Sequence, residues 1–206
     1  MSDALQKIRY LTDTLLPGLG YVWLLKEGRI TRLDLAIDRV GQPPPYLVYK
    51  PRAKHYSHAQ GHTTFYVGSS SSPLGFAIYN KSEQAKATGQ PGYSLASIYR
   101  FEARLRRIPW KFYELPHTLS NPFDRLILID RAAAAGLSHD PAWQSFLQAC
   151  VIQHVGPALV GLKESQRRKY RKMLLSARAK WWLPPKSWQP NLKIALRTID
   201  PWSDVL

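Results

Sequence analysis

The 206-residue chain carries 29 Lys and Arg against 14 Asp and Glu, which gives a formal net charge of +15. An apolar content of 45% with 12% aromatic residues excludes a disordered chain and predicts one sizeable core. The excess of positive charge points to nucleic acid or an anionic membrane as the partner. No apolar run approaches the roughly 18 residues of a membrane span, no signal-peptide pattern begins the chain, and Cys150 is its one cysteine. We therefore expect a cytoplasmic protein that does not enter a membrane.

The first half of the chain favours strands. An amphipathic helix is expected over residues 2–16, where Pro17-Gly18 ends it. The apolar stretch 21–25 and the alternating stretch 29–40 predict a hairpin turning at Glu27-Gly28. Further strands are expected at 46–50, 63–67, 75–79 and 97–106, with a polar loop over 50–61 and a short helix over 82–87.

The second half favours helices. Asn121-Pro122 and Asp140-Pro141 each resemble an N-cap followed by proline at the first helical position, which predicts helices to about residues 135 and 155. A third helix is expected from about 162 to 182. The order indicates an α+β fold with a central, mainly antiparallel sheet. We expect a sheet domain over residues 1–115 and a helical, basic segment over 116–206, packed on the same domain.

Two carboxylates mark the stretch 31–38. On a strand, Arg32, Asp34 and Asp38 share one face, and Glu102 lies on a second alternating strand with Arg100 and Arg104. Buried carboxylates need a cation or a guanidinium, and oxygen ligands suit Mg²⁺ or Mn²⁺. The alternative is structural: Asp34 would pair with Arg32 or Arg100, and Glu102 with Arg104.

Two further segments carry groups that suit phosphate chemistry. Strand alternation puts Tyr79 and Lys81 on one face, where an ammonium would help a tyrosine hydroxyl attack a phosphodiester. The turn that contains Gly68 and Ser69 offers backbone N–H and hydroxyl donors for a phosphate. Each has a plain alternative, an ordinary strand tyrosine in the first case and a flexible hairpin loop in the second.

Taken in order, TRLDLAID, TTFYVGSSSSPLGFAIYNKSEQ and YRFEARLR resemble the replication initiation factor family of rolling-circle plasmids and filamentous phages, which includes Rep-trans-type initiators and related relaxases. The resemblance covers roughly residues 29–107. It implies a fold related to the His-hydrophobic-His endonucleases and relaxases. It also implies a metal-dependent enzyme that nicks single-stranded or origin DNA and stays joined to the 5′ end through tyrosine, with a host helicase as a further partner.

The resemblance also implies residue roles. Asp34, Asp38 and Glu102 would hold Mg²⁺ or Mn²⁺, Tyr79 would be the nucleophile, and Lys81 would assist it. Some relatives place a tyrosine beside the glutamate; here that neighbour is Phe101, and Tyr99 alternates away from Glu102, so Tyr99 is the second choice. Contacts to DNA phosphates or to the carboxylates would come from Arg32, Gly68, Ser69, Arg100 and Arg104.

Two other readings stay open. A non-catalytic DNA- or RNA-binding protein could use the same scaffold, although three carboxylates would repel phosphate unless they were loaded with metal. A hydrolytic nuclease would need the carboxylates but not Tyr79. The related endonuclease superfamily uses a His pair for its ion, but His55, His58 and His62 are not spaced as His-hydrophobic-His and fall in a polar segment that we interpret as a solvated or DNA-facing loop.

The strongest basic segment is 161–197, which holds eleven Lys or Arg against Glu164 alone. We expect it to bind DNA phosphates, chiefly through Arg167, Arg168, Lys169, Arg171 and Lys172. Trp181, Trp182 and Trp188 follow in the same segment, and we expect them to pack in the core rather than to stack on bases.

Overall fold

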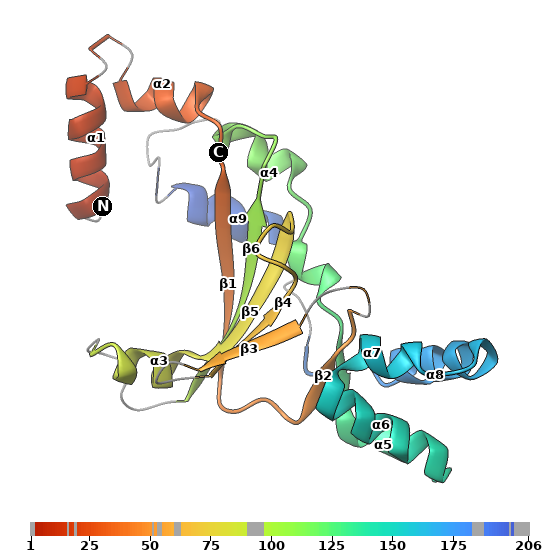
Figure 1. Cartoon of the computed structure of the whole chain (residues 1–206). Helices are drawn as coiled ribbons and strands as arrows, with labels where there is room; N and C mark the ends of the chain where they lie inside the picture. The colour runs from red at the N-terminus through yellow and green to blue at the C-terminus, as the bar shows by residue number, and fades with distance from the viewer. Residues whose placement is uncertain are drawn as a thin grey trace. The chain divides into compact units, whose positions relative to one another are not determined.

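The structure is a computed structural model (Figure 1) that describes residues 3–15, 17–18, 20–50, 52, 55–59, 63–89, 97–182, 188–197 and 199. For residues 55–59 it describes the backbone alone. The fold is α+β, as the sequence predicts.

The strands are β1 (Arg32–Val40), β2 (Tyr46–Val48), β3 (His55–Ala59), β4 (Thr63–Val67), β5 (Leu74–Asn80), β6 (Ile98–Arg106) and β7 (Leu128–Asp130). The helices are α1 (Asp3–Leu15), α2 (Gly20–Glu27), α3 (Lys81–Ala87), α4 (Leu115–Thr118), α5 (Arg131–Gly136), α6 (Pro141–Gln153), α7 (Val155–Val160), α8 (Glu164–Ser176) and α9 (Trp188–Arg197). Two 3₁₀ turns are η1 (Phe112–Glu114) and η2 (Pro122–Arg125).

Five strands form the main sheet in the order β1-β6-β5-β4-β3. Strands β3, β4 and β5 pair antiparallel, with Thr64 opposite Tyr79. A hydrogen bond from Gly41 N to Ser97 O joins the end of β1 to the beginning of β6, and one from Arg107 N to Thr31 O joins the end of β6 to the beginning of β1. These two strands are therefore antiparallel, and the register places Asp38 opposite Arg100 and Asp34 opposite Arg104.

The two faces of this sheet differ in character. Phe76 and Phe101 lie on the apolar face, where Phe101 packs against Tyr46, Trp181 and Trp182. The two pairs of side chains that the register places opposite each other, Asp38 with Arg100 and Asp34 with Arg104, lie on the other face together with Tyr79. We call this second set the polar face: Asp34, Asp38, Tyr66, Tyr79, Arg100, Glu102 and Arg104.

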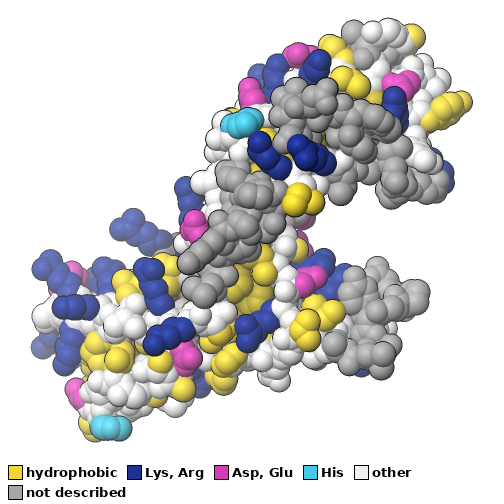
Figure 2. Space-filling model, turned by 180° about the vertical axis from the view of Figure 1, so that it is seen from behind, with side chains coloured by type: hydrophobic (Ala, Val, Ile, Leu, Met, Phe, Trp, Pro, Cys, Tyr) yellow, Lys and Arg dark blue, Asp and Glu magenta, His cyan; other side chains and the backbone are white. Residues whose placement is uncertain are grey.

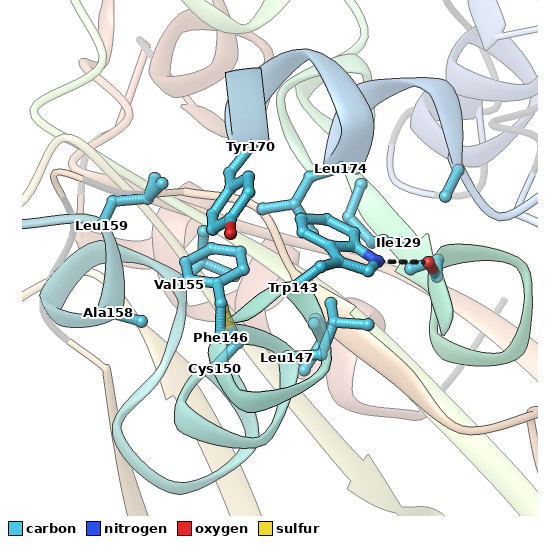
Figure 3. Packing of buried hydrophobic residues seen from close by; sticks show 13 residues of the cluster. Ile129, Trp143, Phe146, Leu147, Cys150, Val155, Ala158, Leu159, Tyr170 and Leu174 are labelled. Carbon is cyan, nitrogen blue, oxygen red and sulfur yellow. Dashed lines mark hydrogen bonds between the residues drawn. The ribbon is translucent and has the colours of Figure 1, made fainter. Parts of the chain in front are cut away.

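A second core lies among the helices α5 to α8 and the short β2–β7 sheet (Figure 3). Trp143 at its centre stacks on Phe146 and meets the edge of Tyr170, and its indole N–H donates to Ala134 O at 2.9 Å. This bond satisfies the polar atom of a side chain that is otherwise fully buried. Tyr170 and Leu174 are the buried residues of α8 and Met173 packs beside them, so the opposite side of that helix faces solvent.

Contacts divide the chain into two compact units. Unit 2 comprises residues 34–104 and 123–183, and so holds most of the sheet together with α3 and α5–α8. Unit 1 comprises residues 1–33, 105–122 and 184–206, with α1, α2, α4 and α9. Within unit 1, Lys111 Nζ pairs with Glu27 Oε2 at 2.6 Å, and α4 packs on α9.

The structure overturns the predicted N-terminal hairpin, because residues 20–27 form the helix α2 and not a strand. A short apolar run fits either element, and tertiary contacts decide. Gly20 takes the left-handed φ of 64° that turns the chain back from α1, and Asp13 Oδ1 accepts the backbone N–H of Tyr21 at 2.7 Å. Packing of α2 on α1 then replaces pairing with β1.

Three other element predictions were wrong, each because backbone pairing with another segment outweighed a local pattern; the partner is the adjacent strand for β3 and a distant segment in the other two cases. The predicted loop 50–61 contains β3, a polar strand at the edge of the sheet. The predicted helix beginning at Pro122 is broken by β7, which pairs with β2. The predicted helix 162–182 begins at Glu164 and ends at Ser176, since Ala177 O and Ala179 N bond to the backbone of β7.

Candidate functional site

Tyr79 and Glu102 meet on the polar face. Tyr79 is the next-to-last residue of β5, and its hydroxyl donates to Glu102 Oε2 at 3.0 Å. Both residues are almost fully buried, with exposed fractions of 6% and 9%. Strand alternation puts them on one face, and the adjacency of β5 and β6 brings them into contact. Tyr99 lies on the opposite face of β6, as the sequence predicts.

Guanidinium groups flank this pair on both sides along β6. Arg100 donates two parallel hydrogen bonds to Asp38, from Nε to Oδ1 at 2.7 Å and from Nη2 to Oδ2 at 2.6 Å. Arg104 donates from Nε to Glu102 Oε1 at 2.6 Å, and its guanidinium lies 5.3 Å from the ring centre of Tyr66. The result is a network of polar contacts that runs across β1, β6, β5 and β4.

The electrostatics hold Tyr79 in its neutral form. Burial and the neighbouring charge of Glu102 raise the pKa of Tyr79 to about 12, and Arg100 acts in the opposite direction. The hydrogen bonds to Asp38 raise the pKa of Arg100. Burial is the largest single influence on the pKa of Arg104 and lowers it, but the hydrogen bond and the charge of Glu102, together with Tyr66, outweigh burial and the pKa is raised. Both guanidinium groups are therefore permanent cations beside the phenol.

The expected metal ligands are not arranged as a metal site. The prediction of two inward-facing aspartates was wrong: β1 is an edge strand, and Asp34 and Asp38 lie on its exposed face. Arg100 engages both oxygens of Asp38, while Arg104 and Tyr79 engage those of Glu102. Within the described ranges, no three His, Cys, Asp or Glu side chains gather as a metal ion requires. As they stand, these residues do not fit Mg²⁺ or Mn²⁺.

Other expected site residues lie elsewhere. Lys81 begins α3, so strand alternation no longer relates it to Tyr79, and its Nζ donates to Gln84 Oε1 at 3.0 Å. Gly68 lies beside Gly75, four residues from Tyr79, which corresponds to roughly 13 Å along β5, and Ser69 follows Gly68. The hydroxyl of Ser69 bonds to those of Ser71 and Ser72. Arg32 is the first residue of β1. Of the three histidines discussed above, His62 falls outside the described part of the chain.

A basic face runs along α8, formed by Arg168, Lys169, Arg171 and Lys172, all exposed. Figure 2 shows Lys and Arg side chains gathered at the left of that view, where α8 lies. Arg167 does not belong to this face. Its guanidinium donates to Leu159 O at 3.1 Å and to Leu162 O at 3.0 Å, and so it caps the end of α7.

The pairing of Glu102 with Arg104 that we weighed as the structural alternative is observed, whereas the contact of Tyr66 with Arg104 and the two-bond pairing of Arg100 with Asp38 were not predicted. Register could have identified Tyr66, because its backbone lies two residues from the partner of Tyr79 in β4. The paired arginines had a weaker signal, the alternation of Arg and Glu in β6, which equally fits metal ligands surrounded by phosphate contacts. The expected packing of Trp181 and Trp182 is observed, since both lie against Phe101; the side chain of Trp188 is not described.

No helix within the described ranges combines the length and the apolar character needed to cross a bilayer. A scan against protein-family models finds none that matches the chain, and a search of curated proteins finds no match. The function must therefore be argued from the residues of the polar face and of α8.

Proposed function

We propose that the chain is a rolling-circle DNA replication initiator, a site-specific nickase and ligase of single-stranded DNA that acts in the cytoplasm through a 5′-phosphotyrosine intermediate. The observation that carries the proposal is the hydrogen bond from the Tyr79 hydroxyl to Glu102 between two arginines. A buried phenol paired with a carboxylate has its proton acceptor already in place. Asp38, Tyr79 and Glu102, which come from the three stretches that resemble the family, thus take part in one set of contacts.

In the proposed reaction, the Tyr79 oxygen attacks phosphorus and its proton passes to Glu102 Oε2. The bond from phosphorus to the 3′ oxygen breaks, and that oxygen leaves as a hydroxyl after taking a proton from Glu102 or water. Arg100 and Arg104 stabilise the negative charge that develops on the phosphoryl oxygens. The reverse sequence joins the strand again, because the phosphotyrosyl bond conserves the energy of the phosphodiester.

The fold we propose with this function is related to that of relaxases and His-hydrophobic-His endonucleases. Support comes from the antiparallel sheet, with aromatic packing on one face and the motif residues on the other. Dependence on Mg²⁺ or Mn²⁺ stays a prediction of the resemblance, and no step above uses a metal. A host helicase as partner stays a prediction on the same ground.

The deciding experiment incubates the full chain with labelled single-stranded oligonucleotides from its own replicon, with and without Mn²⁺, and resolves the products on a denaturing protein gel. A covalent adduct that is lost in Tyr79→Phe supports the proposal. Two variants are matched controls: Tyr99→Phe, on the opposite face of the sheet, and Tyr66→Phe, on the neighbouring strand β4 two residues from the partner of Tyr79. Both should keep the adduct. An adduct that survives Tyr79→Phe would overturn the assignment of the nucleophile.

A second candidate is a non-catalytic DNA-binding protein, and one observation favours it. Asp38 and Glu102 are each neutralised by an arginine, so the polar face need not repel phosphate in the absence of metal. Salt-sensitive binding with neither adduct nor cleavage on the cognate origin would select this candidate. Cleavage without an adduct would select a hydrolytic nuclease instead.

A further inference from the structure

A cavity of about 320 Å³ lies on the other side of unit 2, away from the polar face, and belongs to no step proposed above. Its walls come from β2, β4, α5 and α6 and from the junction of α6 with α7. They are mostly apolar or aromatic, with Val48, Phe65 and Val155 among them. The size is within the range of small-ligand pockets, which are lined in the same way around a few polar groups.

The charged group at this cavity is Arg131. It also lines a second cavity of about 290 Å³ that shares Leu47 and Val151 with the first, so the guanidinium stands at the border of the two. Its backbone N–H donates to Pro45 O. For the side chain, no ion pair or hydrogen bond forms within the described part of the chain. A half-buried guanidinium without a carboxylate is suited to bind a planar or tetrahedral anion through two hydrogen bonds.

His154 provides an independent sign of function. It lines the same cavity with backbone angles φ 69° and ψ 165°, a region that only glycine adopts without strain. Non-glycine residues persist there when the surrounding structure holds them, and such residues concentrate at ligand sites. The imidazole lies 5.4 Å from the ring of Phe65, so an aromatic surface faces the space beside Arg131.

From the cavity, the guanidinium and the strained histidine, we propose that this pocket binds a single nucleotide, with the phosphate on Arg131 and the base against Phe65 and His154. An anion and a flat ring are the two features that the walls select, and a nucleotide has both. The site is separate from Tyr79, so the proposal does not depend on the nicking reaction. The ligand could be a free nucleotide or the 5′-phosphorylated end of a strand, which present the same chemistry.

The test titrates the full chain with dTMP, thymidine, inorganic phosphate and benzoate by calorimetry. We expect dTMP to bind more tightly than the other three. Arg131→Ala should weaken dTMP binding at least tenfold, Arg131→Lys should restore part of it, and His154→Gly should weaken it several-fold. Arg125→Ala, which removes an exposed arginine of the same unit outside the cavity, is the matched control and should bind as the wild type. Melting temperatures establish that each variant folds.

Three outcomes would overturn the proposal. They are the absence of dTMP binding, equal binding of thymidine or benzoate, and equal losses in Arg131→Ala and Arg125→Ala. A competition step identifies the source of the ligand: a 5′-phosphorylated oligothymidylate that displaces dTMP, where the unphosphorylated strand does not, indicates a strand end. Displacement by neither strand indicates a free nucleotide. Both results support the site.

Discussion

Tyr79 lies between two groups of opposite effect. Glu102 accepts its hydrogen bond and disfavours the phenolate, whereas Arg100 on the other side favours it. In the proposed reaction, the phenol is therefore kept protonated until an incoming phosphate changes the local charge, and Glu102 then accepts the proton. This balance depends on a single carboxylate, which makes Glu102 the residue whose neutralisation is most informative.

Glu102→Gln removes the charge that raises the pKa of Tyr79 but keeps a side chain of the same shape. We expect the Tyr79 transition, followed as the difference in tyrosinate absorbance between each protein and its Tyr79→Phe form, to move below its wild-type pKa of about 12. Loss of the proton acceptor should slow adduct formation about a hundredfold or more. Asp124→Asn, an exposed carboxylate outside the polar face, serves as the control. A transition that does not move would contradict the electrostatic role of Glu102.

The same pKa predicts a sign for alkaline stability. An unfolded tyrosine loses its proton near pH 10, whereas folded Tyr79 keeps it until about pH 12. The contribution of this residue to stability is therefore complete below pH 10 and falls as the pH rises through that window. Denaturant unfolding of the wild type and Tyr79→Phe at these pH values measures the difference.

Among the elements, α6 and α8 are held together by Trp143. Its indole fills the space between Phe146 and Tyr170, and its one polar atom is satisfied by Ala134 O. Trp143→Ala should lower the free energy of unfolding by about 3–5 kcal/mol, the range for large aromatic side chains in cores. Trp143→Phe keeps an aromatic ring but loses the indole hydrogen bond to Ala134 O, which still accepts from Leu137 N at 3.2 Å, so a smaller loss of about 1–3 kcal/mol is expected.

Denaturant unfolding followed by circular dichroism measures both variants. The control is Ile152→Ala on the same helix α6, where the side chain is 81% exposed, and its effect should stay within about 0.5 kcal/mol. If Trp143→Ala cost no more than this control, the helical core would not depend on the tryptophan.

The sequence predicts elements well where local signals and tertiary contacts agree. Asp140 followed by proline begins α6 as expected, and alternation places β1, β5 and β6 within a residue or two of their observed bounds at most ends. It fails where a distant partner decides. The apolar stretch 126–129 fits a helix by composition, but β2 pairs with it, and the capping side chain of Asp130 then delays α5 to Arg131.

On the polar face, too, local features were predicted and features that depend on distant segments were not. Strand alternation is local, so the shared face of Asp34 and Asp38, and the separation of Tyr99 from Glu102, follow from the sequence. Strand order is not local, and nothing in the residues 32–40 identifies β1 as an edge strand. The carboxylates that we expected to need a metal therefore lie opposite arginines instead.

At the scale of the whole molecule, the positive charge is distributed unevenly. The basic face of α8 exposes four cations that are opposite the Tyr170 and Leu174 side of the helix, while Arg167 is used within the protein. Judged by charge alone, all five residues are equally good candidates for binding phosphate. The structure separates phosphate-binding candidates from a residue that stabilises the fold.

Alanine at Arg168, Lys169, Arg171 and Lys172 together should reduce the slope of log K against log salt for single-stranded DNA by about 3, at about 0.7 for each lost phosphate contact. Arg167→Ala should leave the slope unchanged and instead lower the melting temperature. Fluorescence anisotropy at several salt concentrations measures the first effect. Alanine at the exposed residues Lys26, Lys86, Arg125 and Arg197 removes an equal charge; a slope reduced as much by this set would argue against α8 as the contact surface.

The two compact units also differ in how soon they can form during synthesis. Every stretch of unit 2 precedes residue 184, so this unit can fold as soon as α8 and the segment after it have left the ribosome. Unit 1 includes α9, which packs on α4, and the hydroxyl of Tyr21 in α2 donates to Ile199 O, so unit 1 is complete only after residues near the end of the chain have been translated. The nascent chain can therefore complete the polar face and most of the sheet while α4 and Tyr21 still lack their C-terminal contacts.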